Sequence, residues 1–264
     1  MTRRIFGVDF SGARDAGRRI RIAEGEASPK GLRILACRPA EELRGGARER
    51  GPALVALRQF IAQHRDAIFG CDFPFALPRE IASARTWDSF IAGFDYADAA
   101  TFREACRRLS PGREPRRETD RDARTPWCAF NLRLYHQTYW GLAGLLRPLV
   151  SARAVAVLPM QEPASGLAWM IETCPASVLK HLNWKGSYKS ASLADERRAI
   201  LQLLERRGHL ASLDGKLADR IFADPGGDAL DSVIAALATA RALGDIASGR
   251  GSGDKIEGRV YYEV

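Results

Sequence analysis

The stretch Ile5-Phe6-Gly7-Val8-Asp9-Phe10 is nearly repeated at Ile68-Phe69-Gly70-Cys71-Asp72-Phe73. Each copy is a short apolar run that ends on an aspartate, and turn-forming residues follow. An apolar run of this length between polar flanks predicts a buried strand of a parallel or mixed sheet. A carboxylate at the C-terminal end of such a strand lies where open α/β sheets bind ligands. The two copies therefore predict one shared site that contains Asp9 and Asp72.

The segments between the two copies predict the start of a mixed sheet. Residues 19–23 alternate between polar and apolar, and residues 31–37 form a third strand after a short hairpin connection. Residues 52–64 have the periodicity of an amphipathic helix with proline in its first turn. Because this helix is a crossover, it predicts that the strand at 67–72 pairs in parallel with a neighbour.

The rest of the chain divides into a helical insertion and a return to the sheet. Residues 77–150 predict helices near 86–93, 98–108 and 128–147, around a run at 110–124 so rich in charge that it must be solvated. We expect this insertion to cap a domain formed by residues 1–76 and 151–264. The expected later elements are strands at 154–158, 168–172 and 260–262, and helices near 175–182, 194–207 and 228–243.

Composition limits the class of protein. The chain has 264 residues, 46% hydrophobic and 27% charged, which is ordinary for a globular protein. No apolar stretch is long enough to cross a bilayer, and there is no room for a signal peptide before the first strand. Five cysteines without a C-x-x-C pair predict free thiols in a reducing cytoplasm. The net charge of +8 suits a polyanionic partner such as nucleic acid.

Five carboxylates stand at chemically informative positions: Asp9, Asp72, Glu172, Asp228 and Asp231. The first three end apolar strands, and Asp231 interrupts an almost wholly apolar helix. A buried carboxylate is costly unless it is paired or binds a metal, and no Lys or Arg lies within the apolar runs. Mg²⁺ or Mn²⁺, which prefer oxygen ligands, would be the simplest partner, and such a cluster fits a two-metal site for phosphoryl transfer.

Each carboxylate also has a purely structural interpretation. Asp9 and Asp72 could shape turns, and Glu172 could pair with a basic residue elsewhere. Asp228 follows Pro225-Gly226-Gly227 and is typical of a helix N-cap. The sequence contains no H-E-x-x-H, no G-x-S-x-G and no G-x-x-x-x-G-K-[ST], which argues against the corresponding zinc, serine-hydrolase and P-loop chemistries.

The order of these motifs resembles the DUF429 family of predicted RNase H-like nucleases. The similarity rests on G-V-D-F-S-G-A, C-D-F-P, I-E-T-C-P-A and G-D-A-L-D-S-V-I-A-A-L and covers residues 4–73 and 168–264. It implies an RNase H-like α/β fold, a divalent-metal site and phosphodiester hydrolysis. It also implies that Asp9, Asp72 and Asp231 or Asp228 are metal ligands and that Glu172 is a motif residue. RNases H carry a further Glu on the helix after the third strand, and the helix at 52–64 has none.

Basic residues supply candidates for substrate contact. Lys185 and Lys189 lie beside Tyr188 in a polar loop, and Arg116 and Arg117 lie in the charged run. These cations could contact phosphates, or they could belong to solvated loops.

The leading hypothesis is a cytoplasmic metal-dependent nuclease or related phosphohydrolase in which Asp9, Asp72, Glu172 and Asp231 hold Mg²⁺ or Mn²⁺ ions. The alternatives are a non-catalytic nucleic-acid-binding or protein-interaction module on the same fold, and an actin-like nucleotide phosphotransferase.

Overall fold

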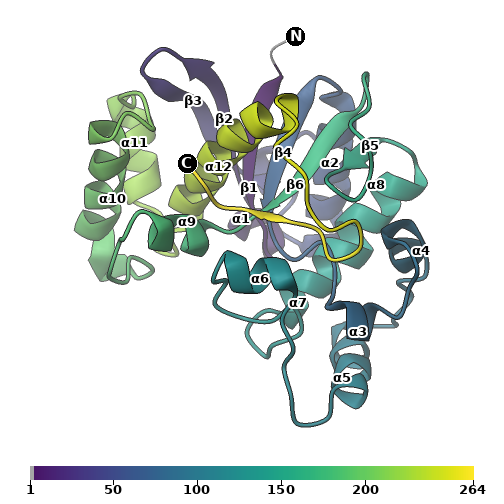
Figure 1. The fold of residues 1–264 in the computed structure, drawn as a ribbon. Helices are drawn as coiled ribbons and strands as arrows, with labels where there is room; N and C mark the ends of the chain where they lie inside the picture. The colour runs from purple at the N-terminus through teal and green to yellow at the C-terminus, as the bar shows by residue number, and fades with distance from the viewer. Residues whose placement is uncertain (1–2) are drawn as a thin grey trace.

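The computed structural model describes residues 3–264 and has an α/β fold in which helices flank a mixed seven-stranded sheet (Figure 1). The strand order is β3-β2-β1-β4-β6-β5, and β7 pairs with the end of β6. The pairs β1–β2 and β2–β3 are antiparallel, and all other pairs are parallel. The strands are β1 (Arg4–Asp9), β2 (Arg21–Ser28), β3 (Gly31–Pro39), β4 (Ala67–Asp72), β5 (Val155–Val157), β6 (Ala168–Thr173) and β7 (Val260–Tyr261).

The two similar hexapeptides are the two central strands. They pair in parallel and in register, so that Gly7 lies opposite Gly70 and Asp9 lies opposite Asp72. The predicted parallel pairing is confirmed. Because side chains alternate along a strand, both aspartates point to the same face of the sheet as the two glycines.

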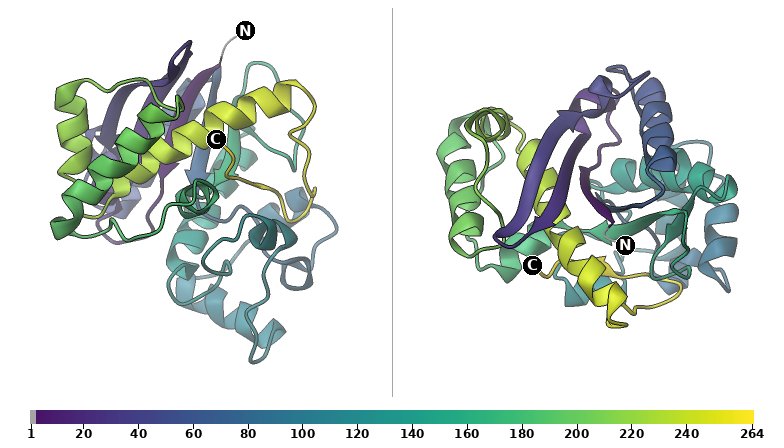
Figure 2. Two further views of the ribbon diagram at one scale, coloured as in Figure 1. Left: turned by 60° about the vertical axis from the view of Figure 1, so that its left-hand side comes forward. Right: turned by 90° about the horizontal axis from the view of Figure 1, so that it is seen from above.

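Helix α12 (Asp228–Ala247) crosses that face diagonally (Figure 2). It approaches so closely that a Cβ added at Gly7 would lie 2.0 Å from the Ser232 carbonyl oxygen and 2.2 Å from the Ala236 nitrogen. A Cβ at Gly70 would lie 1.9 Å from Thr239 Oγ1. Both central strands therefore need glycine at the same level for one helix to pack on them.

The opposite face of the sheet packs against α2 (Arg50–Gln63) and the segment 77–150. One continuous apolar core contains side chains from the strands, such as Phe69, and from this segment, such as Phe102 and Leu142. The segment extends beyond the edge of the sheet in Figure 1. It contains α3 (Arg79–Ala82), α4 (Trp87–Ala92), α5 (Ala99–Leu109), α6 (Glu118–Asp122), α7 (Tyr135–Tyr139), a π-helix (Trp140–Leu146) and α8 (Arg147–Ser151).

The remaining helices surround the start of α12 and the β2–β3 side of the sheet. In Figure 2, α10 and α11 form an outer layer beyond α12. Apart from two short 3₁₀ turns at Ala40–Glu42 and Ala191–Leu193, these helices are α1 (Ala16–Arg19), α9 (Pro175–His181), α10 (Ala194–Arg206) and α11 (Gly215–Phe222).

Two expectations about helices are wrong. The helix expected over 128–147 begins only at Tyr135, because Asn131 Oδ1 accepts a hydrogen bond of 2.9 Å from the Arg133 nitrogen and so stabilises a turn. Helix α11 was not expected. Asp214 caps it by accepting hydrogen bonds of 3.0 and 3.4 Å from the nitrogens of Lys216 and Leu217.

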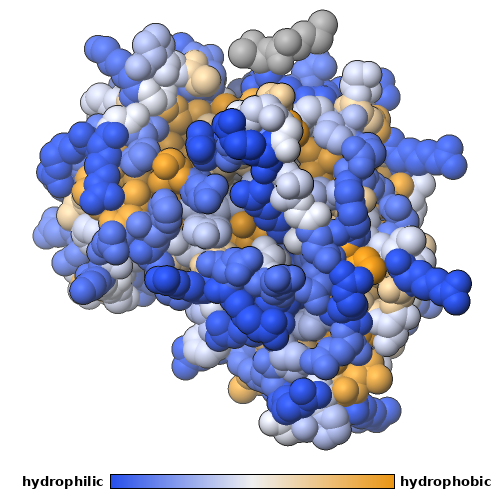
Figure 3. All heavy atoms as spheres, viewed as in Figure 1, coloured by the Kyte–Doolittle hydropathy of each residue, from blue (hydrophilic) through white to orange (hydrophobic). Residues whose placement is uncertain are grey.

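Hydrophilic side chains dominate the face of the molecule seen in Figure 3, and apolar residues show only in patches between them. Among the helices of residues 3–264, none combines the length and the apolar character that a membrane span requires.

We expect Gly7→Ala to lower the free energy of unfolding by about 1–3 kcal/mol, because the added methyl group collides with the backbone of α12. Gly244→Ala is a matched control in the same helix, where a Cβ meets nothing within 4 Å. This control should raise stability by about 0.5–1 kcal/mol. Urea denaturation measures both effects, and equal stability of the two variants would contradict the packing argument.

Candidate carboxylate site

Asp9 and Asp72 form the centre of the site. They end the paired strands β1 and β4 in register, and the charge of Asp72 is among the causes that raise the pKa of Asp9. Asp9 is 8% exposed, and Asp72 is partly buried. Like charges on neighbouring carboxyl groups disfavour ionisation of both.

Asp231 joins them from α12. The close approach of this helix to Gly7 places Asp231, which is 1% exposed, over the ends of the two strands. Its charge helps to raise the pKa of both Asp9 and Asp72. The structure therefore brings together three of the predicted site residues, from three separate elements.

The electrostatics of the cluster are those of crowded, desolvated carboxylates. Burial, followed by the charge of Asp231, raises the pKa of Asp9 well above its usual range and that of Asp72 to about 7. Burial and then Asp224 raise the pKa of Asp228 to about 6. A bound cation would relieve this repulsion.

Lys189 is the cation that the protein itself supplies. Its Nζ lies 2.5 Å from Asp231 Oδ2, and Tyr188 donates a hydrogen bond of 2.6 Å from its hydroxyl group to Asp231 Oδ1. The Lys189 contact is an ion pair without hydrogen-bond geometry, and Oδ2 has no hydrogen-bond partner. The charge of Asp231 raises the pKa of Lys189.

Asp228 is not the helix N-cap that its sequence position indicates. The N-cap is Gly227, with φ of +76°, and Asp228 is the first helical residue. Asp224 caps the start of α12 instead, because its Oδ2 accepts a hydrogen bond of 2.7 Å from the Ala229 nitrogen in the first turn. Asp224 also pairs with Arg21 at 3.2 Å. Asp224 and Arg21 were not expected near the site, although the Asp224-Pro225 pair is a turn signature.

Glu172 lies on the other face of the sheet. It pairs in register with Cys71, one residue before Asp72, and the alternation of side chains points it towards the segment 77–150. There Arg117 binds it in a bidentate ion pair, with Nη1 2.7 Å from Oε2 and Nη2 2.5 Å from Oε1. The Phe75 nitrogen donates a further hydrogen bond of 2.9 Å. Glu172 thus faces away from Asp9, Asp72 and Asp231 and has its own counter-ion, although its charge still contributes to the raised pKa of Asp72.

This pairing corrects two expectations about the charged run. Arg117 is 0% exposed and binds both Glu172 and Asp120, so it is a buried structural cation rather than a substrate contact. The run at 110–124 is therefore not fully solvated. Burial raises the pKa of Glu172, and the charge of Arg117 opposes that effect.

The other two basic candidates lie outside the cluster. Arg116 is half-buried and donates to the carbonyl oxygens of Thr125 and Pro126 at 2.9 and 3.0 Å, which ties down the charged run. Lys185 is exposed to solvent.

The donor set suits a hard divalent cation, because Asp9 and Asp72 present carboxylate oxygens at the same level of two paired strands. Within residues 3–264, no three His, Cys, Asp or Glu side chains are arranged as a metal-binding group. Among residues 3–264, no basic side chain forms a salt bridge with Asp9, Asp72 or Asp228, whereas Asp231 pairs with Lys189.

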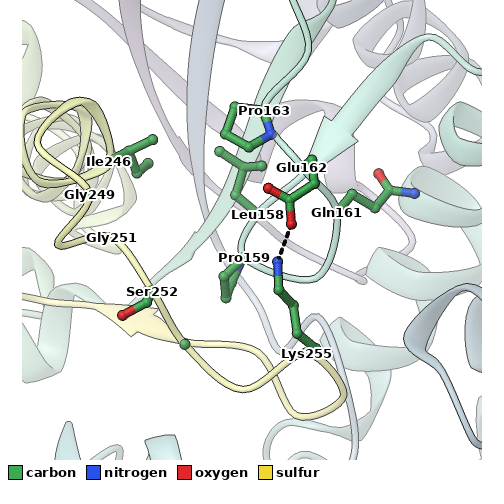
Figure 4. Close-up of a pocket in the computed structure, with 11 residues that line it drawn as sticks. Leu158, Pro159, Gln161, Glu162, Pro163, Ile246, Gly249, Gly251, Ser252 and Lys255 are labelled. Atoms are coloured by element: carbon green, nitrogen blue, oxygen red, sulfur yellow. Dashed lines mark hydrogen bonds and ion pairs between the residues drawn. The ribbon is translucent and has the colours of Figure 1, made fainter.

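A separate pocket, lined in part by apolar side chains such as Leu158 and Ile246, lies away from the carboxylate cluster (Figure 4). It has a volume of about 210 Å³ and lies between the segment after β5 and the loop after α12. Lys255 and Glu162 form an ion pair of 2.8 Å at its edge. None of the predicted site residues lines it.

Comparisons with protein-family models, with curated proteins and with solved structures gave no match. The similarity to DUF429 therefore stays a prediction from the motifs.

We expect the free energy of unfolding in metal-free buffer to fall as pH rises from about 4 to 8. The folded state holds protons on Asp72 up to a pKa of about 7, whereas the unfolded state releases them near pH 4. Asp72→Asn removes this titration and should stabilise the protein by about 2 kcal/mol at pH 8, with little gain at pH 4. Denaturant titrations across pH measure this, with Asp219→Asn on the exposed face of α11 as control. A parallel pH profile for wild type and Asp72→Asn would contradict the assignment.

We expect Arg117→Met to lower the free energy of unfolding by about 3–5 kcal/mol at pH 8, because Glu172 and Asp120 lose their buried counter-ion. The loss should be smaller at pH 5, because burial raises the pKa of Glu172 and its carboxylate can then take up a proton once Arg117 is gone. Arg113→Met is the control, since Arg113 is exposed and its nearest carboxylate oxygen, on Glu80, is 3.8 Å away. Equal losses in the two variants would show that Arg117 has no special role.

Proposed function

We propose that this chain is a divalent-metal-dependent nuclease or related phosphohydrolase with an RNase H-like fold. The observation that carries the proposal is the convergence of Asp9, Asp72 and Asp231 at the carboxyl ends of the central parallel strands. In open α/β sheets this edge is where ligands bind.

The topology supports the fold assignment. Three antiparallel strands are followed by a helical crossover into a parallel strand beside the first, and a long helix then crosses the same sheet. This is the order that the resemblance to DUF429 implies.

The carboxylates have the character that a metal-dependent site requires. Asp9 and Asp72 would hold Mg²⁺ or Mn²⁺, and such a cation supplies charge stabilisation and activates water for attack on a phosphodiester. Asp231 and Lys189 would set the charge balance around it, and Asp228 lies one helical turn from Asp231. The strands that carry the two aspartates, β1 and β4, are buried along almost their whole length.

The charge of the chain supports nucleic acid as the substrate class. The net charge is +8, and Lys185 and the exposed side of Lys189 lie on the loop next to the cluster.

A second candidate function is nucleic-acid binding without turnover. Two observations favour it: Lys189 already neutralises Asp231, and α2 contains no acidic residue. This candidate predicts nucleic-acid binding with a steep salt dependence and no turnover in the presence of any metal.

We expect Mn²⁺ or Mg²⁺ to stabilise the protein, by about 2.7 kcal/mol at a hundredfold excess over the dissociation constant. We also expect cleavage of at least one member of a panel of DNA, RNA and hybrid substrates. Asp9→Asn and Asp72→Asn should abolish the metal-dependent stabilisation. They should also reduce cleavage by more than about 100-fold, because loss of an outer-shell partner alone costs about 10–100-fold.

Asp219→Asn is again the control and should match wild type. Binding of the panel without cleavage in either metal would favour the second candidate. Cleavage that survives both substitutions would refute the site.

A further inference from the structure

Both oxygens of Asp231 are engaged by one short loop. Tyr188 donates its hydroxyl group to Oδ1, and Lys189 Nζ is 2.5 Å from Oδ2. The carboxylate is 1% exposed, whereas the Lys189 side chain is 51% exposed. The lysine therefore reaches from solvent into the cluster and delivers its charge to a buried group.

A buried arginine fixes the backbone on both sides of Lys189. Arg197 Nη1 donates to the carbonyl oxygens of Tyr188 and Ser190, each at 2.7 Å. Its Nε and Nη2 donate to the Phe222 carbonyl oxygen at 3.0 and 2.9 Å. Arg197 is 1% exposed and lies on α10. The buried Arg197 guanidinium group holds the residues on both sides of Lys189. The position of Lys189 is therefore fixed by buried hydrogen bonds rather than by a surface contact.

The start of α12 packs against the same loop. A Cβ at Gly227 would lie 3.1 Å from the Tyr188 ring, and φ at Gly227 is +76°. The loop, the helix start and Asp231 therefore pack directly against one another.

Lys189 acts on the whole cluster. Its charge lowers the pKa of Asp9, Asp72 and Asp228, against the larger raising effect of burial in each case. Arg21, a second cation near the cluster, is paired with Asp224. Lys189 contacts the cluster through Asp231.

We infer that the Lys189 ammonium group is a tethered cation that takes the place of one metal ion at Asp231, so that a divalent cation binds at Asp9 and Asp72 alone. This inference rests on the proposed function and refines it, because a cluster of this many carboxylates would otherwise suit a pair of ions. The ammonium group has three N–H donors, so donors not used by Asp231 remain for a substrate phosphate oxygen.

The test is the number of Mn²⁺ ions bound, measured by isothermal titration and by electron paramagnetic resonance. We expect one ion in wild type and two in Lys189→Met, with a spin–spin coupling between the ions that wild type lacks. Lys185→Met is the matched control on the same loop and should bind one ion. Lys189→Arg keeps the positive charge and should also bind one.

The comparison between variants tests the inference, and the wild-type count tests the proposed function. An equal count in wild type and Lys189→Met overturns the inference. If wild type binds no ion and Lys189→Met binds one, the replacement of a metal ion by Lys189 is supported, whereas the metal site at Asp9 and Asp72, and with it the proposed function, is overturned. Should Lys189→Met unfold because Asp231 is left unpaired, recovery of its circular dichroism on adding Mn²⁺ supports the inference. Failure of Mn²⁺ to restore the fold, with an unchanged count in Lys189→Gln, overturns it.

Discussion

The contact between α12 and two glycines determines the rest of the structure. Gly7 and Gly70 lie side by side on the central strands, and without side chains they let the helix backbone approach the sheet directly. That approach carries Asp231 to the ends of the strands, where Asp9 and Asp72 stand in register. A wider spacing between helix and sheet would leave three separate carboxylates rather than a cluster. The electrostatic crowding of the site is therefore a consequence of backbone packing.

The two faces of the sheet divide the acidic residues into two systems. On the α12 face, Asp9, Asp72 and Asp231 share limited positive charge from Lys189. On the opposite face, Glu172 forms a buried ion pair with Arg117, which also pairs with Asp120. The carboxylates on the α12 face could still bind a cation. The Arg117–Glu172 pair instead stabilises the junction between the sheet and the segment 77–150. Asp72 and Glu172 therefore belong to different charge clusters, although they lie one residue apart in the strand register.

Much of this arrangement could be predicted from the sequence, because it depends on local patterns. The apolar runs predict β1 and β4, the crossover predicts their parallel pairing, and the isolated Asp231 in an apolar helix predicts its burial in the core. The long-range pairs could not be predicted. Arg117 meets Glu172 across 55 positions of sequence, and nothing in the charged run distinguishes it from its exposed neighbours. The turn at Asn131 and the cap at Asp224 likewise depend on single hydrogen bonds that compete with helix periodicity.

The likeness of the two hexapeptides has a bearing on the history of the chain. Both strands lie beneath one helix at the same level, so each meets the same requirement for a small residue, an apolar partner face and a terminal carboxylate. A shared neighbour is enough to impose a shared motif on unrelated segments. The repeat therefore needs no ancestral duplication, and drift in either copy is restrained by the helix that they hold in common.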